Sequence, residues 1–404
     1  MQKVLVTGIG AVTSIGNTVP EYWQNLIDGK CGIDLIKRIS TDEHDTKVAA
    51  EVDDSFEVLP KKYWKKRQLN ATTRMERMAL ASAGEAVDDS GLDFEQTDCL
   101  RVGVIYGIIN NSFIDEEKDN SLNLILKDTP SVCPALISLK YGLQGAAFNV
   151  STACASSAYA AALGAQFIKS GLYDIVIIGG MGSSVSHYSL KGFNQIMAMS
   201  VNEDPKKASA PFTKNRDGFI MGEGGGTMIL ESEKSAKKRG AKIYCELAGT
   251  SLYSEAYNLT APLTDGIGME KTMRMALDDA GISPDEVDYI NAHGTSTVLN
   301  DLYETMAIQK LFGERANSIP VSSIKGSIGH TLGAGGVLEG IACVKAIETG
   351  ILPPTIHYDE PDPKLTLDYI PNKAREKKID IAISNSFGFG GHNATLVFRR
   401  YSDE

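Results

Sequence analysis

Short apolar runs alternate along the chain with longer segments of helical character. The runs are rich in β-branched residues and predict strands at 4–6, 101–106, 148–150, 174–178, 227–230, 244–248, 287–290, 320–322 and 379–384. Helical segments at 74–89, 155–169 and 336–348 lie between several of these strands, and each is followed by a glycine that tolerates a left-handed C-cap. This alternation predicts an α/β fold, with a mixed or parallel sheet covered on its faces.

Two segments share one order of elements, which indicates an internal duplication. Residues 148–171 run as a strand, a turn, a helix of small residues and a glycine stop, and residues 320–350 repeat that order. The divide between the copies is expected at 239–242, after the charged stretch 231–242, which gives halves at 1–240 and 241–404. No linker rich in proline or serine separates them, so we expect the halves to pack as one body.

Composition narrows the class of protein. The 404 residues are 43% hydrophobic and 23% charged, which suits a globular chain and excludes an intrinsically disordered one. A net charge of −11 argues against nucleic-acid and anionic-membrane binding. The N-terminus lacks the pattern of a signal peptide and is interpreted as a strand running into a glycine turn at Gly8, so a cytoplasmic protein without membrane spans is expected.

The six cysteines are scattered, and one of them lies in a distinctive context. Their spacing excludes CxxC pairs and argues against a disulfide framework. Cys154 stands where a strand ends in a turn of small residues and a helix opens. A helix N-terminus lowers the pKa of a thiol, so a thiolate near neutral pH is expected there. This context alone leaves a nucleophile and a buried structural cysteine equally open.

Two histidines strengthen the nucleophile interpretation. His293 and His330 each follow a predicted core strand and lie in glycine-rich loops, where active sites of α/β proteins are usually found. One such histidine would more often be structural, but two beside a similarly placed cysteine favour catalysis. A zinc site is the weaker interpretation, because no pair of ligands is close in sequence.

Two further segments of the chain are rich in glycine. In 387–393, glycines flank Phe387 and Phe389, so backbone amides could face an oxyanion while the rings gate a channel; a tight turn with two core aromatics fits equally well. The stretch 216–226 lacks both the Walker A lysine and the spacing of a dinucleotide-binding loop, so a phosphate site is not expected there.

Taken in order, these motifs resemble those of the β-ketoacyl-acyl-carrier-protein synthases, which are condensing enzymes of the thiolase-like superfamily. The best match is the elongating type II synthase together with its polyketide relatives. The resemblance covers nearly the whole chain, from 6–13 through the Thr-Ala-Cys-Ala-Ser-Ser loop to Arg-Asp-Gly-Phe, Ala-His-Gly-Thr-Ser-Thr and Asn-Ser-Phe-Gly-Phe-Gly-Gly. It implies duplicated halves in a layered αβαβα arrangement.

The resemblance also implies a Cys-His-His mechanism. Cys154 would accept an acyl group, a malonyl carrier thioester would lose CO2, and the enolate would attack the acyl group to give a chain two carbons longer. The enzyme itself would bind no cofactor, because the substrates are carried on phosphopantetheine. The implied site residues are His293 and His330 for the enolate, the amides of Cys154 and Phe389 for the oxyanion, Lys325 with Glu304 as its charge partner, Asp301 in support, Thr295 and Thr297 for pantetheine, and Phe387, Phe389 and Ile108 for the gate and acyl pocket.

The implied partners are an acyl carrier protein and a second ketosynthase-like chain, in a homodimer or a heterodimer. A basic cluster around Tyr63 and Trp64 would suit an acidic carrier protein, although a solvated helix face explains it slightly better from sequence alone. The cluster consists of Lys61, Lys62, Lys65, Lys66 and Arg67.

Two alternatives stay open, and one region departs from the family pattern. A partner subunit of the chain-length-factor type would act by binding, but Cys154 argues against it; a thioester hydrolase or acyltransferase is the other alternative. In initiating synthases of this family the corresponding position resembles Asn, whereas here it is His330. Residues 105–111 replace an expected glycine-rich turn, and the segment from there to 142 is about ten residues short. This departure favours a specialised synthase of secondary metabolism.

Overall fold

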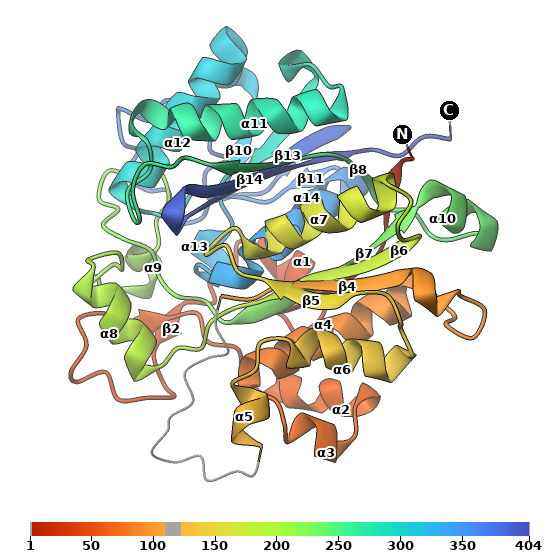
Figure 1. Ribbon diagram of the computed structural model, residues 1–404. Helices are drawn as coiled ribbons and strands as arrows, with labels where there is room; N and C mark the ends of the chain where they lie inside the picture. The colour runs from red at the N-terminus through yellow and green to blue at the C-terminus, as the bar shows by residue number, and fades with distance from the viewer. Residues whose placement is uncertain (1, 110–122, 404) are drawn as a thin grey trace.

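The computed structural model describes residues 2–109 and 123–403, and it shows five alternating layers of helices and sheets (Figure 1). Helices α11 (Ile267–Ala280) and α12 (Val298–Phe312) cover one outer face, and α4 (Arg74–Ser90) and α6 (Val132–Tyr141) cover the other. Helices α7 (Ser156–Lys169) and α14 (Gly335–Thr349) form the middle layer. The predicted α/β class with layered αβαβα architecture matches this arrangement. Asn110 and Asn111, which belong to the departing segment, lie outside the described residues.

The two sheet layers are parts of one hydrogen-bonded sheet of ten strands, in the order β10-β9-β13-β14-β8-β1-β7-β6-β4-β5. The parts join where β1 and β8 pair antiparallel through Leu5 with Glu246 and Val6 with Cys245. The strands are β1 (Val4–Thr13), β4 (Val102–Gly107), β5 (Ala147–Val150), β6 (Ile175–Met181), β7 (Gly224–Ser232), β8 (Cys245–Ser254), β9 (Tyr289–Asn291), β10 (Val321–Ser322), β13 (Ile381–Gly388) and β14 (His392–Arg399).

Shorter elements decorate this framework. Two small antiparallel pairs are β2 (Asp34–Leu35) with β3 (Val48–Ala49) and β11 (Ile351–Leu352) with β12 (Arg375–Glu376). The remaining helices are α1 (Val19–Ile27), α2 (Pro60–Tyr63), α3 (Lys66–Leu69), α5 (Leu124–Lys127), α8 (His187–Gln195), α9 (Pro205–Ala208), α10 (Glu233–Arg239) and α13 (Lys325–Ile328). The predicted boundary near residue 240 falls between α10 and β8, and the division into two halves remains a prediction.

Strand β1 corrects the interpretation of the N-terminus. The chain does not turn at Gly8 but continues as a fully buried strand to Thr13. The glycines are needed for close packing against α4: a Cβ atom on Gly8 would lie 2.4 Å from the Ala86 carbonyl oxygen, and one on Gly10 would lie 2.0 Å from the Ser82 carbonyl oxygen. In this strand, glycine therefore marks contact with a helix.

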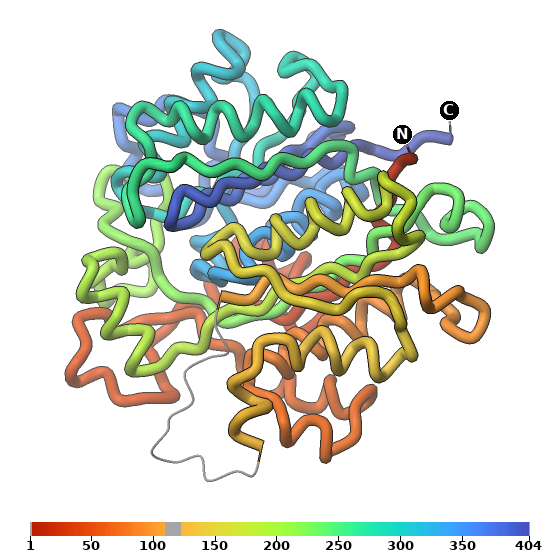
Figure 2. The backbone as a smooth tube through the Cα atoms, viewed as in Figure 1, coloured from red at the N-terminus to blue at the C-terminus, as the bar shows by residue number. Residues whose placement is uncertain are grey.

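The glycine stops predicted after three helices are confirmed, with positive φ at Gly91, Gly171 and Gly350. Strand β14 was not predicted, although it pairs along its whole length with β13 and β8. The two ends of the chain lie side by side (Figure 2), and the Lys3 ammonium lies 5.5 Å from the centre of the Tyr401 ring.

Candidate active site

Cys154 lies in the tight turn between β5 and α7. Ala153 adopts a positive φ of 50°, which is uncommon for a residue with a side chain. Ser156 secures the turn, because its hydroxyl donates to the Ala153 carbonyl and accepts from the Thr152 N–H at 2.9 Å. The Cys154 side chain is nearly buried and lines a cavity of about 490 Å³. The turn thus places Cys154 at this cavity.

The expected thiolate is not what the structure supports. Burial raises the pKa of the Cys154 thiol to about 11, and the Lys325 charge and the backbone N–H groups of Phe389 and Cys154 only partly oppose this. Removal of the sulfur from water therefore outweighs the lowering effects of that charge and of those two N–H groups. At neutral pH the resting group is a thiol.

His293 lies just beyond β9, and a buried carboxylate holds its backbone. The N–H groups of His293 and Gly294 donate to the two oxygens of Glu304 on α12, each at 2.8 Å. Asn385 adds a third hydrogen bond at 3.1 Å. Burial raises the pKa of Glu304 to about 7, and these three donors oppose the rise. Glu304 therefore fixes the loop that carries His293.

The charge partner of Lys325 is Glu339 on α14, so the expected pairing with Glu304 is wrong. Lys325 and Glu339 form an ion pair in which both side chains are 2% exposed. The Lys325 ammonium also donates to the His293 carbonyl at 2.5 Å and lies 3.4 Å from His293 Nδ1. An ammonium can only donate, so Nδ1 must accept and the proton of a neutral His293 lies on Nε2.

His330 packs edge-on against His293, and both line the cavity. Their ring centres lie 5.3 Å apart at 83°, and Phe219 packs against His330 with ring centres 5.4 Å apart. The Leu332 N–H donates to His330 Nδ1 at 3.3 Å, which leaves the proton on Nε2. Nε2 is buried and has no hydrogen-bond partner among the described residues. It is therefore free to donate to a bound substrate.

Both imidazoles are kept neutral. Burial lowers the pKa of His293 well below its ordinary value, and the charge of Lys325 lowers it further. The pKa of His330 is lowered for the same two reasons. Two neutral imidazoles with Nε2–H groups on one cavity can donate hydrogen bonds to a developing negative charge.

The loop of Phe387 and Phe389 closes the site beside the sulfur. Both residues line the cavity, and the Phe387 ring centre lies 6.0 Å from that of His293. A Cβ atom on Gly388 would lie 3.2 Å from the Cys154 backbone nitrogen and 3.1 Å from the Thr152 carbonyl oxygen. Glycine therefore permits the amides of Phe389 and Cys154 to approach one another.

Of the remaining expected residues, some reach the cavity and others do not. Thr295 and Thr297 line it, with their hydroxyls 2.9 Å apart. Asp301 is buried away from the lining, where it accepts from the Phe212 N–H at 2.8 Å and lies 3.6 Å from Arg216. Ile108 is packed in the core behind the sheet, and its neighbour Ile109 lines the cavity instead. The placement of Ile108 in the acyl pocket is therefore wrong.

Sequence reasoning missed several residues of the site. Glu339 carried one signal, since it is the only charged residue between Gly335 and Val344 in an otherwise apolar helix. Phe193, Phe219 and Leu332 carried none, because apolar residues of this kind also fill ordinary cores. They belong to the apolar side of the cavity, next to Cys154.

The basic cluster lies on another part of the surface. Its residues belong to α2, α3 and the connecting turn, and all five are exposed. Four of them line an open groove of about 1080 Å³: Lys61, Lys62, Lys65 and Lys66. Trp64 is buried beneath, where its indole N–H donates to the Leu136 carbonyl at 3.2 Å.

The described residues contain neither a metal-binding cluster nor a membrane-spanning helix. Within residues 2–109 and 123–403, no group of three or more His, Cys, Asp or Glu side chains is placed to hold a metal ion. Across the same residues, no helix is long and apolar enough to cross a membrane.

Comparison with known proteins identifies the family. The family model for the β-ketoacyl synthase N-terminal domain matches residues 1–236, and the model for the C-terminal domain matches residues 244–359. This chain is 40% identical to the 3-oxoacyl-[acyl-carrier-protein] synthase 2 of Coxiella burnetii, covering 100% of this chain and 99% of the relative. It is 38% identical to the protein of the same name from Synechocystis sp., covering 99% and 98%. The chain therefore belongs to the β-ketoacyl synthase family.

Solved structures agree with this assignment. One is a type II polyketide acyl carrier protein in complex with its ketosynthase, with a TM-score of 0.89, 33% identity and coverage of 99% of this chain and 100% of that one. Another is the ishigamide ketosynthase/chain length factor, with a TM-score of 0.90, 34% identity and the same coverage. The predicted thiolase-like ketosynthase fold is confirmed, and so is the class of condensing acyltransferase.

Proposed function

We propose that this chain catalyses the decarboxylative condensation of a malonyl group, carried on an acyl carrier protein, with an acyl group held on Cys154. The main support is that one cavity is lined by Cys154 and by two neutral imidazoles, each with its proton on Nε2, and that Nε2 of His330 has no hydrogen-bond partner among the described residues. Sulfur is the atom that would hold the acyl group, and the imidazoles would stabilise the enolate.

In the first step, the Cys154 sulfur attacks the carbonyl carbon of the acyl thioester. The oxyanion of the tetrahedral intermediate accepts hydrogen bonds from the backbone N–H groups of Cys154 and Phe389. The bond to the pantetheine sulfur then breaks, and the proton of the Cys154 thiol passes to that departing sulfur. One thioester replaces another, so no net proton is released.

In the second step, the malonyl thioester binds with its carbonyl oxygen between His293 and His330. The bond to the carboxylate breaks, CO2 leaves, and the electron pair moves into an enolate whose oxygen accepts both Nε2–H groups. Neutral imidazoles suit this task, because each donates a hydrogen bond to the enolate oxygen and keeps its proton. Lys325 would hold the tautomer of His293 by its contact with Nδ1.

In the third step, the enolate carbon attacks the acyl carbonyl on Cys154. A carbon–carbon bond forms, the bond to sulfur breaks, and the thiolate takes up a proton from water to restore the resting thiol. The product is a β-ketoacyl thioester that is two carbons longer. Thr295 and Thr297, at the polar side of the cavity, would bind the pantetheine arm.

The test separates the step that depends on His330 from the step that depends on Cys154. The variant His330→Ala should lose CO2 release from malonyl carrier protein while Cys154 can still be acylated. The variant Cys154→Ala should lose ketoacyl product. Unchanged CO2 release by the first variant would refute the role of His330. Condensation by the second variant, in complex with its partners, would show that this chain acts as a binding subunit.

The basic cluster is our proposed docking site for the carrier protein. Its five cations are exposed, and none of them forms an ion pair with another described residue, so they would steer an acidic partner. Reversing two of them, as in Lys62→Glu with Lys65→Glu, should raise KM for malonyl carrier protein without changing CO2 release from malonyl-pantetheine. An equal effect on both substrates would refute docking at this cluster.

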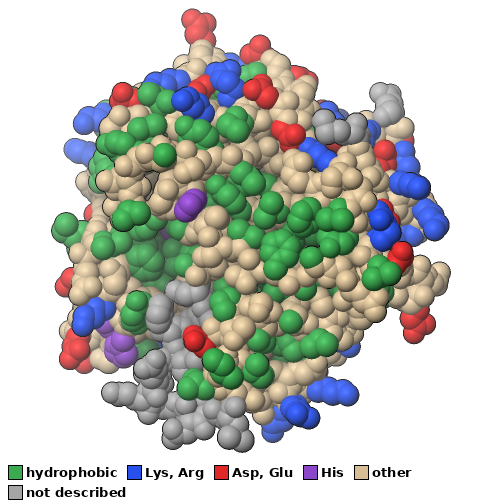
Figure 3. All heavy atoms as spheres, viewed as in Figure 1, with side chains coloured by type: hydrophobic (Ala, Val, Ile, Leu, Met, Phe, Trp, Pro, Cys, Tyr) green, Lys and Arg blue, Asp and Glu red, His purple; other side chains and the backbone are tan. Residues whose placement is uncertain are grey.

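A second ketosynthase-like chain is our proposed partner at strand β5. This strand lies at the end of the ten-stranded sheet, and its side chains are half-buried, including Phe148 and Val150. Figure 3 shows apolar side chains gathered on this face of the molecule. Native mass spectrometry of the purified chain should give a dimer that Val150→Lys dissociates; a monomer that is fully active alone would refute the proposal.

A further inference from the structure

A short segment next to β7 holds the backbone of His330. The His330 N–H donates to the Ile220 carbonyl at 2.7 Å, and the Gly222 N–H donates to the His330 carbonyl at 2.9 Å. Phe219, from the same segment, packs edge-on against the imidazole. Both the backbone and the ring of His330 are therefore positioned by residues 219–222.

Residues 219–222 are packed closely against the His330 loop and against Ala50. A Cβ atom on Gly222 would lie 2.1 Å from the Ile328 carbonyl oxygen, and one on Gly329 would lie 3.0 Å from the carbonyl oxygens of Ile220 and Met221. On its other side, the Ala50 N–H donates to the Met221 carbonyl at 2.9 Å. A displacement of the segment would therefore move the loop of His330 with it.

A buried ion pair anchors the end of the segment. Glu223 is 1% exposed, and its Oε2 accepts from the Val52 N–H at 3.0 Å and from Nε and Nη2 of Arg74, both at 3.3 Å. Its Oε1 has no hydrogen-bond partner among the described residues. Arg74 is the partner that compensates this buried carboxylate, because it is the cation in contact with it.

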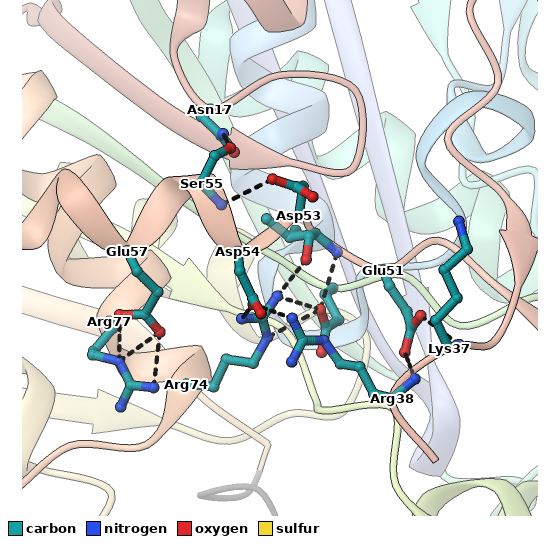
Figure 4. Close-up of polar contacts among 12 residues, drawn as sticks. Asn17, Lys37, Arg38, Glu51, Asp53, Asp54, Ser55, Glu57, Arg74 and Arg77 are labelled. Carbon is teal, nitrogen blue, oxygen red and sulfur yellow. Dashed lines mark hydrogen bonds and ion pairs between the residues drawn. The ribbon is translucent and has the colours of Figure 1, made fainter. Parts of the chain in front are cut away.

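Arg74 is itself held in place at the start of α4 (Figure 4). Its guanidinium donates to the Val52 carbonyl and to Asp54, the latter at 2.6 Å, and its carbon lies 4.8 Å from the centre of the Phe56 ring. Five donors in a planar fork allow arginine to make these contacts at once. Arg74 thus connects the start of α4 to Glu223 at the end of segment 219–223.

Building on the proposed role of His330 in decarboxylation, we propose that Arg74 and Glu223 are positioning residues for that imidazole. Their ion pair clamps residues 219–223 and thereby fixes the direction of the His330 Nε2–H group in the cavity. Neither residue lines the cavity, so neither touches the substrate. Loss of the clamp should weaken enolate stabilisation while leaving substrate binding intact.

The test compares Arg74→Met and Glu223→Gln with a matched control. In the control, Arg239→Met breaks another arginine–glutamate pair, in which Arg239 contacts the fully buried Glu231 at 2.7 Å at the opposite end of β7. For each variant, kcat and KM for CO2 release from malonyl carrier protein are measured, together with the acylation rate of Cys154 and the melting temperature.

We expect kcat for CO2 release to fall about 10- to 100-fold in the two variants, because small misplacements of a catalytic group have effects of this size. KM and the acylation rate should stay unchanged, and the control should keep its kcat despite a similar fall in melting temperature. If Arg74→Met does not fold, Arg74→Lys keeps the charge but not the forked contact and provides the same comparison.

Unchanged kcat in Glu223→Gln and Arg74→Lys would overturn the inference, and so would an equal loss of kcat in the control. Failure of the proposed function has a different signature: His330→Ala would then release CO2 at the wild-type rate, whatever the result at Arg74 and Glu223.

Discussion

Replacing Lys325 with methionine removes one half of a buried ion pair and leaves the Glu339 carboxylate without its cation. Both side chains are 2% exposed, so water cannot replace the lost partner. Breaking such a pair costs about 3–5 kcal/mol, a large share of the roughly 5–15 kcal/mol that stabilises a typical fold. We therefore expect Lys325→Met to be folded at 25 °C but to unfold at a much lower urea concentration.

Removing both charges should restore stability but not activity. In Lys325→Met with Glu339→Leu no buried charge is left uncompensated, so most of the lost free energy of unfolding should return. The enzyme should stay inactive, because the donor that fixes the His293 tautomer and carbonyl is still missing. Malonyl decarboxylation and urea unfolding, followed by circular dichroism, measure the two effects separately.

The pH dependence provides an independent check on the same pair. Burial raises the pKa of Glu339 above its ordinary value, and loss of the Lys325 charge raises it further. A group with a raised pKa in the folded state binds protons more readily there, so its penalty disappears as the pH falls. The deficit of Lys325→Met should therefore shrink from pH 8 to pH 5. A deficit independent of pH, or a double variant no more stable than the single one, would refute the reasoning.

Three further predictions concern the cavity. Since burial raises the pKa of Cys154 to about 11, its alkylation by iodoacetamide should accelerate about tenfold per pH unit from pH 7.5 to 9.5; a plateau near pH 8 would contradict this. Since the pKa values of His293 and His330 are lowered, both imidazoles should stay neutral from pH 8 to pH 6, which NMR shifts of the imidazole carbons measure; a titration midpoint at the ordinary value of about 6.5 would count against it. Gly388→Ala would place a Cβ atom 3.2 Å from the Cys154 nitrogen, so acylation should slow about 10- to 100-fold at an unchanged melting temperature, which stopped-flow acylation measures.

The sequence predicted the elements of the fold well wherever one pattern dominated. The helix over 74–89 is α4 with one added residue, and its glycine stop has the expected positive φ. Strand β1 was predicted too short, because glycine usually interrupts a strand. Only the structure shows that Gly8 and Gly10 face a helix that leaves no room for side chains.

Predictions about the site succeeded for residues within recognisable motifs. They failed where the outcome depends on the distance between side chains or on burial. Cys154, His293 and His330 do share a cavity, as their positions after core strands indicated. The partner of Lys325 was misassigned. Glu304 lies on a helix that follows His293, and Glu339 lies on a helix that follows His330, so sequence spacing does not say which carboxylate reaches the ammonium. The thiol pKa was mispredicted, because a helix N-terminus is visible in a sequence but the degree of burial is not.

The pairing of β1 has a consequence for synthesis of the chain. All ten of its residues are buried, yet the strands that cover its two edges begin at Gly224 and Cys245. At roughly 5–20 residues per second, a ribosome would need on the order of 10 to 50 seconds to deliver them. During that time both edges of this apolar segment stay unpaired, which makes it a segment that a chaperone would bind.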